Sequence, residues 1–380
     1  MAEATGPADR GLDGVVAART RLSHVDGEKG MLIIGGYELS ELAGRVTFEE
    51  AAHLLWKGSL PGRAELATLR AEMAALRKLP ESAMQVLRSA RGALPIDALR
   101  MACATLSLDV GVDGEISKEA DLTRARMLTA RFPTAVAAHA RIAAGKEPVA
   151  PRPDLAHAAN FLYMVHGSEP DPVVARALDT YWVTVIDHGM NASTFTARVI
   201  ASTRSDMVSA VTGAIGALKG PLHGGAPGPV LDMLQEIGSA ANAEAWLANE
   251  LAAGRRIIGF GHRVYKVRDP RADVLSRVAE EMSNAVLHDR KLFDLARSVE
   301  QTALRVLEEH KPGRNLRTNV EFYTALVLQS LGLHPQSFVS LFACGRVAGW
   351  CAHVIEQHAA DRLIRPQSEY IGPRGLKVAI

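Results

Sequence analysis

The residues best suited to chemistry lie in one short segment, residues 259–271, which reads GFGHRVYKVRDPR. Its two glycines let backbone approach a ligand closely, and they flank a phenylalanine just before His262, a residue type that donates or accepts protons near neutral pH. Four cations follow in the same segment: Arg263, Lys266, Arg268 and Arg271. Arginine binds phosphates and carboxylates through a bidentate fork, and lysine binds them as a point charge. The segment therefore predicts a site for an anionic, phosphorylated substrate beside an acid–base residue; a solvated basic loop is the alternative.

A second candidate group follows a predicted helix. Asp171-Pro172 is a favourable helix start, and the apolar residues after it recur with the spacing of a buried helix face. His188 and Asn191 come at the end of that helix, where polar groups beside an apolar face need hydrogen-bond partners. Both are candidates for substrate binding, although a histidine satisfied inside the core is the more frequent outcome at such a position.

A third histidine, His223, lies in the glycine- and proline-rich stretch 220–228 (GPLHGGAPG). So many glycines around one histidine indicate a close approach of backbone to a ligand. The predicted helix over residues 230–237 would begin just after it, and a helix N-terminus disfavours the imidazolium cation. A neutral imidazole there could donate a hydrogen bond to a developing enolate.

A carboxylate candidate starts a later helical pattern. Thr318 or Asn319 can cap a helix that runs to Leu331 and is ended by Gly332, which places Glu321 in its first turn. There the helix dipole favours an ionised carboxylate, so Glu321 could accept a proton at neutral pH. An ordinary first-turn acid is the alternative, and this stretch considered alone favours it.

Composition limits the classes of function. The chain has 380 residues, is 48% hydrophobic and 22% charged, and carries a formal net charge of +1, so we expect a packed core and no general attraction to nucleic acid or to a membrane surface. Its three cysteines are scattered, which favours a reducing compartment. No apolar run approaches the roughly 20 residues that span a bilayer. We therefore predict a soluble, cytoplasmic protein.

A metal site is not expected. His353 and His358 are five residues apart, a spacing less suited to one face of a helix than four. The phosphate-binding fingerprints GxGxxG after a strand and GxxxxGK[ST] are also missing, which argues against a Rossmann fold and a P-loop.

The elements that must position these residues are nearly all helices. A small hairpin fits around the turn at residues 26–30, and Thr47 with Glu50 resembles a capping box that begins a helix. A further helix is predicted over residues 64–79, and alternating strand patterns are almost absent after the first forty residues. The glycine-rich stretch 204–225 is a candidate hinge or domain crossing, with a second crossing near residues 311–313.

Taken together, these stretches resemble the citrate synthase family. The segments GPLHGGAPGPVLDML, GFGHRVYKVRDPRADVL, NVEFYTALVLQSLGL and RVAGWCAHVIEQ…RLIRP are similar in content and order to the signatures of that family, and DHGMNASTFTARVIAST and GLDGVVA…DGEKG extend the similarity over nearly the whole chain. The resemblance implies an all-α homodimer of the short dimeric type. Each subunit would have a large domain formed by residues 1–219 and 321–380 and a small domain formed by residues 220–320.

The resemblance also implies roles for single residues in a condensation of acetyl-CoA with oxaloacetate. The catalytic residues would be His223, His262 and Glu321. The oxaloacetate-binding residues would be His188, Asn191, Arg271, Arg346 and, from the partner subunit, Arg365. The coenzyme A contacts would be Ile258, Gly259, Phe260, Gly261, Arg263, Lys266 and Arg268. No permanently bound cofactor is implied, because the coenzyme A thioester is a substrate.

One departure from the family concerns the proton-abstracting residue, which is usually an aspartate where this chain has Glu321. The extra methylene lengthens the side chain by roughly 1.5 Å, a displacement that can cost about 100-fold in rate. A 2-methylcitrate synthase that uses propionyl-CoA remains an alternative, because one methylene is worth only about 1–3 kcal/mol of discrimination. A weakly active homologue kept for assembly or regulation is the other alternative.

Overall fold

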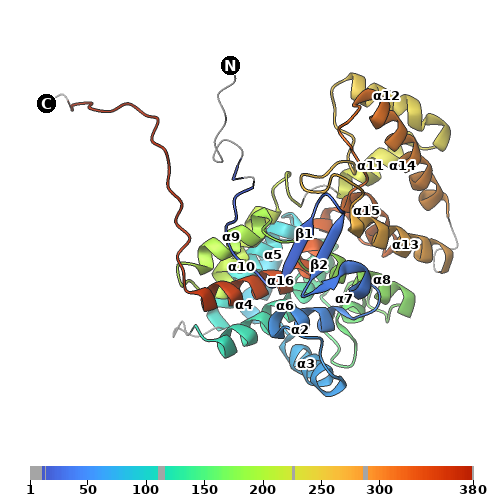
Figure 1. The fold of residues 1–380 in the computed structure, drawn as a ribbon. Helices are drawn as coiled ribbons and strands as arrows, with labels where there is room; N and C mark the ends of the chain where they lie inside the picture. The colour runs from blue at the N-terminus through green and yellow to red at the C-terminus, as the bar shows by residue number, and fades with distance from the viewer. Residues whose placement is uncertain (1–10, 13, 110–115, 225–226, 286–289, 379–380) are drawn as a thin grey trace.

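The computed structural model describes residues 11–12, 14–109, 116–224, 227–285 and 290–378, and it is mostly helical (Figure 1). The all-α prediction is confirmed, and so is the small N-terminal hairpin. The first half of the chain forms β1 (Ser23–Asp26), β2 (Met31–Ile34), β3 (Tyr37–Glu38), α1 (Leu39–Leu42), α2 (Phe48–Lys57), α3 (Arg63–Leu76), α4 (Glu81–Ser89), α5 (Pro95–Thr105), the 3-10 turn η1 (Leu106–Asp109), α6 (Lys118–Ala143), α7 (His157–His166), α8 (Pro172–Val185) and α9 (Ala192–Ala201). The second half forms α10 (Met207–Leu218), α11 (Pro227–Ile237), η2 (Ala240–Asn242), α12 (Ala243–Ala252), α13 (Pro270–Ala285), α14 (Lys291–His310), α15 (Val320–Ser330), η3 (Pro335–Ser337) and α16 (Phe338–Ala360).

The N-terminal sheet is antiparallel and has one strand more than the predicted hairpin. β1 pairs with β2 in the register Ser23 opposite Ile34, and the short β3 adds to the other edge of β2. Leu32 and Ile34 alternate inward along β2 and are buried. The sheet thus anchors the start of the chain to the helical core.

Helix starts follow the predicted capping signals. The Thr47 hydroxyl accepts a hydrogen bond from the backbone N–H of Glu50, and the Glu50 carboxylate accepts one from the backbone N–H of Thr47, so α2 has a complete capping box. Asp171 caps α8 through the N–H of Val173. Both predicted helix starts are confirmed.

Two predicted features differ. The helix predicted over residues 64–79 ends at Leu76, because Pro80 disfavours helical backbone just before it and the Arg77 side chain turns inward to the carbonyl groups of Arg152 and Leu155. The glycine-rich stretch 204–225 contains a regular helix, α10. A Cβ atom at Gly213 would lie 2.3 Å from the side chain of Ile200, so this glycine serves the close packing of α10 on α9.

The centre of the fold is α16, which packs against α2, α6, α8, α9 and α10. Among the described residues it belongs to the one helical segment, Pro335–Ala360, that is long and apolar enough to cross a membrane by length and composition. However, 83% of that segment's most apolar window is buried inside the fold, as in the core helix of a globular protein. The sequence shows no such uninterrupted apolar run, because small residues and Arg346 are spread along it.

The helices α11, α12, α13, α14 and α15 gather at one side of this core (Figure 1). Within the group α12 packs on α14 and α13 packs on α15, and α13 and α15 also contact α8. Most of this group falls within the predicted small domain of residues 220–320, whereas α15 belongs to the segment predicted for the large domain. The boundaries of the small domain stay a prediction.

Candidate active site

One wall of the site is the crossing of α8 and α16. Helix α16 has glycines at positions 345 and 349, on either side of Arg346. A Cβ atom at Gly345 would lie 2.7 Å from Val185 Cγ2, and one at Gly349 would lie 2.1 Å from the carbonyl oxygen of Ile186. Only glycine allows α16 to approach the end of α8 so closely, and this approach fixes the position of Arg346.

The guanidinium group of Arg346 is buried, and no described residue pairs a carboxylate with it. Its Nε donates a hydrogen bond of 2.5 Å to the carbonyl oxygen of Val185, and its carbon lies 4.8 Å from the centre of the Phe342 ring. Its Nη2 has no hydrogen-bond partner among the described residues. Burial lowers the pKa of Arg346 to about 10. A buried cation with an unused donor is a binding group for an anion.

A buried network holds the corner where α8 ends. His353 lies between Arg198 and Asp187: its Nδ1 accepts from Arg198 at 3.0 Å, so its Nε2 carries the proton that reaches Asp187 at 3.1 Å. The Asp187 carboxylate also accepts from the hydroxyl of Ser23 in β1. This network places His188, the next residue, at the edge of the site. It also accounts for His353 without a metal ion.

The opposite wall is the segment 259–271, which is held against the start of α15. Phe260 pairs with Thr318 in a short antiparallel bridge, and Gly259 and Gly261 take positive φ angles of 87° and 84° beside it. The backbone N–H of Asn319 donates to the carbonyl oxygen of Gly259 at 2.9 Å, and its side-chain amide donates to that of Gly261, also at 2.9 Å. The glycines of the motif therefore serve this backbone pairing.

The tautomer of His262 follows from its hydrogen bonds. Its Nδ1 accepts from the backbone N–H groups of Val264 at 3.0 Å and Tyr265 at 3.1 Å, so Nε2 carries the proton of the neutral ring. Arg271 Nη2 lies 3.3 Å from this Nε2, and because both nitrogens then donate, the two are neighbours without a hydrogen bond between them. Burial, followed by the charge of Arg271, lowers the pKa of His262 to about 4. His262 is consequently a neutral imidazole at pH 7 that presents an Nε2–H donor.

Ring contacts join the two walls. The ring centres of His188 and His262 are 5.6 Å apart, and Tyr265 lies 4.8 Å from His262 by the same measure. His188 Nε2 lies 3.1 Å from the Tyr265 hydroxyl. Burial and the charges of Arg271 and Arg346 hold the pKa of His188 well below its ordinary value.

Arg271 is bound to a carboxylate, unlike Arg346. Its Nε and Nη2 donate to the two oxygens of Asp269 at 3.0 and 2.8 Å, and both side chains are buried. Asp269 also accepts from the backbone N–H of Val320 at 3.2 Å, which ties the end of the loop to the first turn of α15. One buried carboxylate thus sets the position of Arg271 relative to Glu321.

Glu321 lies in the first turn of α15, as predicted. Asn319 is the cap, and its side-chain oxygen accepts from the backbone N–H of Glu321 at 3.0 Å. Burial raises the pKa of Glu321 to about 7, and the charge of Arg271 opposes this rise. Glu321 can therefore exchange a proton at neutral pH, which is the property of a general base.

His223 lies in the turn just before α11. Its Nε2 lies 2.8 Å from the Ser193 hydroxyl oxygen, whose own proton is donated to Asn191 Oδ1, and 3.4 Å from the backbone nitrogen of Ser193. Burial, followed by the charge of Arg346, lowers the pKa of His223 to about 4. His223 is thus a second neutral imidazole donor, as predicted, although residues 225–226 between it and α11 lie outside the described part.

The same positive charges act on all of these groups. Arg271 perturbs the pKa of His188, His223, His262 and Glu321, and Arg346 perturbs the pKa of the first two. Such shared electrostatic neighbours indicate that the predicted catalytic residues gather around two guanidinium groups.

Three predicted residues have other partners or another location. Asn191 caps α9 through the N–H of Thr194 and also accepts from the Ser193 hydroxyl. Arg268 is bound to the carboxylates of Glu300 and Asp273. Arg365 lies exposed in the segment after α16, and no described residue of the candidate site is recorded in contact with it.

The residues predicted to contact coenzyme A form two groups. Arg263 and Lys266 are exposed, and their loop is clamped by the β1–β2 turn, where the backbone N–H of Lys266 donates to the carbonyl oxygen of Gly27 at 2.9 Å. Phe260 is buried and packs on Phe322 with ring centres 5.3 Å apart. Gly259 and Gly261 offer only backbone at this edge, and the half-buried Ile258 packs against the hydrophobic core.

The sequence reading assigned no role to three residues that position the site: Asp269, Tyr265 and Ser193. A buried acid two residues before an arginine, in DPR, was a usable signal for Asp269, because the i+2 backbone N–H can bind its carboxylate. Tyr265 and Ser193 meet their partners across distant parts of the chain, so no local pattern could reveal them.

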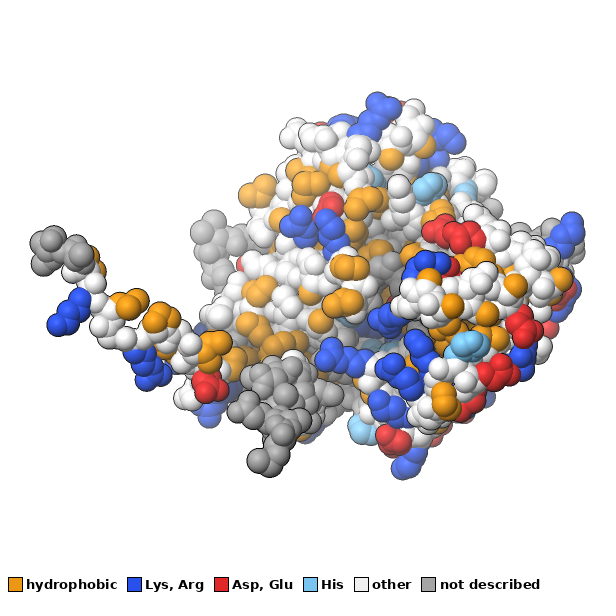
Figure 2. Space-filling model, turned by 90° about the horizontal axis from the view of Figure 1, so that it is seen from above, with side chains coloured by type: hydrophobic (Ala, Val, Ile, Leu, Met, Phe, Trp, Pro, Cys, Tyr) orange, Lys and Arg blue, Asp and Glu red, His pale blue; other side chains and the backbone are white. Residues whose placement is uncertain are grey.

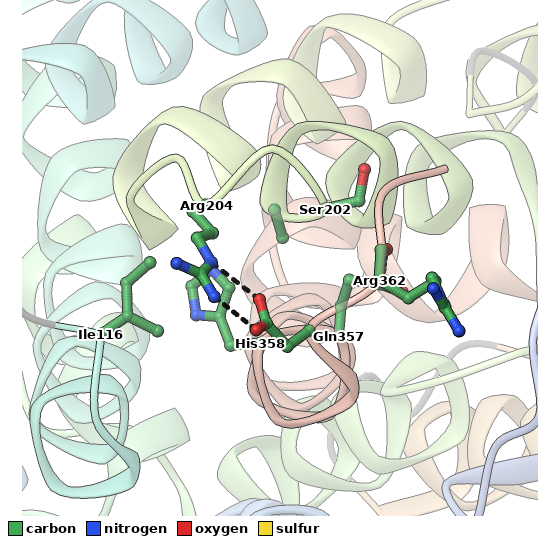
Figure 3. Close-up of a pocket in the computed structure, with 8 residues that line it drawn as sticks. Ile116, Ser202, Arg204, Gln357, His358 and Arg362 are labelled. Carbon is green, nitrogen blue, oxygen red and sulfur yellow. Dashed lines mark hydrogen bonds and ion pairs between the residues drawn. The ribbon is translucent and has the colours of Figure 1, made fainter. Parts of the chain in front are cut away.

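A cavity of about 530 Å³ lies elsewhere, at the end of α16 (Figure 3). It is lined by Ile116, Ala201, Ser202, Arg204, Gln357, His358, Asp361 and Arg362. Two of these, Arg204 and Asp361, are paired with each other, and none of them was predicted for the site. Among the described residues there is also no group of three or more histidine, cysteine or acidic side chains that could hold a metal ion.

The comparisons with known proteins agree with this geometry. The sequence model described as "Citrate synthase, C-terminal domain" matches residues 11–367. The citrate synthase of Haloferax volcanii is 40% identical to this chain, over 98% of each protein. The chain belongs to the citrate synthase family. As a member of that family it is an acyltransferase of the class that converts the acyl group into an alkyl group on transfer.

Solved structures of citrate synthases confirm the predicted fold. The structure from Pyrobaculum aerophilum superposes with a TM-score of 0.89 at 38% identity, covering 97% of this chain and 94% of that one. The ternary complex of a Thermoplasma acidophilum citrate synthase with carboxymethyl coenzyme A and oxaloacetate superposes with a TM-score of 0.90 at 30% identity, covering 98% of each chain. A 2-methylcitrate synthase of Mycobacterium tuberculosis is 38% identical, over 96% of this chain and 90% of the relative.

Proposed function

We propose that this enzyme condenses acetyl-CoA with oxaloacetate and hydrolyses the resulting thioester to citrate and CoA. The observation that carries the proposal is Arg346, a buried guanidinium group with an unused Nη2 donor and no carboxylate partner. Arg346 perturbs the neutral imidazole of His223, and Arg271 perturbs both the neutral imidazole of His262 and the carboxyl group of Glu321, whose pKa is about 7. A dicarboxylate substrate supplies the anion that Arg346 lacks.

Each group then has one task. Glu321 removes a proton from the methyl carbon of acetyl-CoA, and the imidazole N–H of His223 donates to the thioester oxygen where negative charge develops. The enolate carbon forms a bond to the ketone carbon of oxaloacetate, while the Nε2–H of His262 gives its proton to the ketone oxygen. Water then cleaves the carbon–sulfur bond: its oxygen becomes part of the new carboxyl group and one of its protons leaves with the CoA thiol. The proton that Glu321 took up replaces the one that His262 gave, so both groups return to their starting states.

The remaining predicted residues bind the substrates. Arg271 and Arg346, with His188, would hold the oxaloacetate carboxylates, and Asn191 would hold the corner beside His188. The exposed Arg263 and Lys266 would meet the phosphates of CoA, which needs no resident cofactor beside it. Arg268 is bound to the carboxylates of Asp273 and Glu300. We therefore propose that it stabilises this loop and does not contact a phosphate group directly.

A homodimer is part of the proposal. The segment after α16 runs away from the body and exposes apolar side chains along its length (Figures 1 and 2). Ile371 is 93% exposed and Leu376 is 81% exposed, an arrangement that favours burial against another chain. A second copy would take up this segment, and Arg365 would thereby reach the partner's site.

The test is a steady-state assay of CoA release with oxaloacetate and either acetyl-CoA or propionyl-CoA, on the wild type and on Glu321→Asp. We expect the wild type to turn over acetyl-CoA faster than propionyl-CoA, and the aspartate variant to be slower by up to about 100-fold, because the site is built around the longer side chain. If Glu321→Asp instead restores turnover to a nearly inert wild type, Glu321 is a brake and the chain is a weakly active homologue. A preference for propionyl-CoA would make the chain a 2-methylcitrate synthase.

A further inference from the structure

The Tyr181 side chain is completely buried on α8, yet its hydroxyl has no hydrogen-bond partner among the described residues. Other buried hydroxyls without a partner belong to short side chains: Thr129, Thr134, Thr194 and Ser340. Those can rotate toward nearby backbone, whereas a tyrosine hydroxyl is carried at the end of a rigid ring. Phenylalanine would fill the same space without burying an unsatisfied hydroxyl, so this hydroxyl requires an explanation.

The position of Tyr181 places it behind the candidate site. Helix α8 packs against α13, α15 and α16, the helices that carry Arg271, Glu321 and Arg346. Tyr181 precedes Val185 by one helical turn, and the carbonyl oxygen of Val185 holds Arg346 Nε. Tyr181 therefore lies one turn before the residue whose carbonyl oxygen binds the guanidinium group of Arg346.

Electrostatics agree with this placement. Burial is the main cause of the raised pKa of the Tyr181 hydroxyl, and among the charges Arg346 acts on it most strongly, followed by Cys344, Glu321 and Arg271. Conversely, Tyr181 is among the groups that act on Arg346. The hydroxyl and the guanidinium group are thus electrostatic neighbours inside one enclosed region.

Two buried donors without a partner among the described residues thus lie on packed helices: the Tyr181 hydroxyl on α8 and Arg346 Nη2 on α16. The hydroxyl could accept from the guanidinium group, but it would still need an acceptor for its own proton. We propose that Tyr181 is a further substrate-binding residue, whose hydroxyl donates a hydrogen bond to the oxaloacetate carboxylate that Arg346 binds. The inference rests on the proposed function and adds a neutral donor to the cationic ones.

The decisive variant is Tyr181→Phe, which removes only the hydroxyl. Isothermal titration with oxaloacetate alone should give a dissociation constant about 10- to 100-fold higher than that of the wild type. This is the loss of affinity expected when a hydrogen bond to a charged group is removed. The melting temperature of the unliganded protein should stay the same or rise, because an unsatisfied hydroxyl has been removed. The KM for acetyl-CoA should change by less than about twofold, since Tyr181 acts on the other substrate.

Tyr323→Phe is the matched control. Tyr323 is also fully buried, but its hydroxyl donates to Glu300 at 2.6 Å. Its loss should lower the melting temperature of the unliganded protein, because the carboxylate of Glu300 loses a partner, and it should leave the affinity for oxaloacetate within about twofold. Tyr181→Phe should therefore weaken oxaloacetate binding without loss of stability, whereas Tyr323→Phe should lower stability without weakening oxaloacetate binding.

Three results would overturn the inference. Unchanged oxaloacetate affinity in Tyr181→Phe would show that the hydroxyl binds nothing in the complex. A lowered melting temperature like that of Tyr323→Phe would indicate a structural role. An unchanged dissociation constant with a displaced pH profile of kcat would place the hydroxyl on Glu321 instead. If the wild type itself fails to bind oxaloacetate, the proposed function fails as well, so the two failures are distinguishable.

Discussion

Arg346 and Arg271 are both buried and both proposed to bind carboxylates, yet the structures around them differ. Arg346 stands at a crossing of two helices held together by glycine contacts, and its Nη2 has no partner. Arg271 is at the end of a loop held by backbone hydrogen bonds, and Asp269 neutralises it. The crossing of α8 and α16 therefore holds Arg346 rigidly with an unused donor, and we call this crossing the Arg346 socket. The loop instead holds Arg271, whose donors are already bound to Asp269 before substrate arrives.

The largest expected effect follows from removing each cation in turn. Arg271→Met leaves Asp269 as a buried charge without its partner and should lower the free energy of unfolding by about 3–5 kcal/mol. Arg346→Met removes a cation that has no carboxylate partner, so stability should be unchanged or higher. Chemical denaturation of both variants measures the difference, and titration with oxaloacetate should show weakened binding in each. Equal losses of stability would contradict the distinction between the two sites.

A smaller effect is expected from the glycine contacts that build the Arg346 socket. Gly349→Ala would place a Cβ atom 2.1 Å from the carbonyl oxygen of Ile186 and should cost about 1–3 kcal/mol as α16 moves away from α8. Gly216→Ala in α10 is the control. Its Cβ atom would meet nothing closer than 3.9 Å, so helix propensity should raise stability by about 0.5–1 kcal/mol. Thermal unfolding compares the two, and a neutral Gly349→Ala would show that the crossing is not rigid.

The smallest effect concerns pH. Because the pKa of Glu321 is raised to about 7, its ionised fraction falls below that pH, and kcat/KM should fall about tenfold per unit on the acid side. Burial lowers the pKa of His223 and His262 to about 4 in the folded state, whereas the ordinary value is about 6.5. Between these two values the unfolded chain binds protons that the folded protein does not. The free energy of unfolding should therefore be full above about pH 6.5 and should decrease as the pH falls toward 4. A rate profile with its midpoint near 4.5 would contradict the burial of Glu321.

Local signals in the sequence explain much of the fold. The capping box of Thr47 and the Asp171-Pro172 start predicted real helix boundaries, and Asn319 placed Glu321 in a first turn, because these signals act within three or four residues. The resemblance of four long motifs predicted the family, and the roles that it implies for His223 and His262 stay predictions. Local signals and resemblance were therefore sufficient for the architecture and for the principal groups.

Contacts between distant segments could not be predicted in the same way. Helical periodicity says which face of α8 is buried but not that Tyr181 lacks a partner there, because this depends on the rotation of α8 against α16. The glycine at 349 gives no sign in the sequence of the carbonyl group it approaches. The hinge or domain crossing expected in the stretch 204–225 stays a prediction, but the helix α10 within it was not foreseen, because glycine permits close helix packing as well as flexibility and only tertiary contacts decide between them.

The clamp between the N-terminal turn and the site loop has a consequence for biosynthesis. Gly27 holds the backbone of Lys266, so a segment made at the beginning of translation binds one made after more than half of the chain has followed. Until the ribosome has delivered residues 259–271, the N-terminal sheet has no loop to close upon. The N-terminal strands of the nascent chain therefore lack this contact until residues 259–271 have been translated. A chain arrested before that segment would lack the loop of the candidate active site.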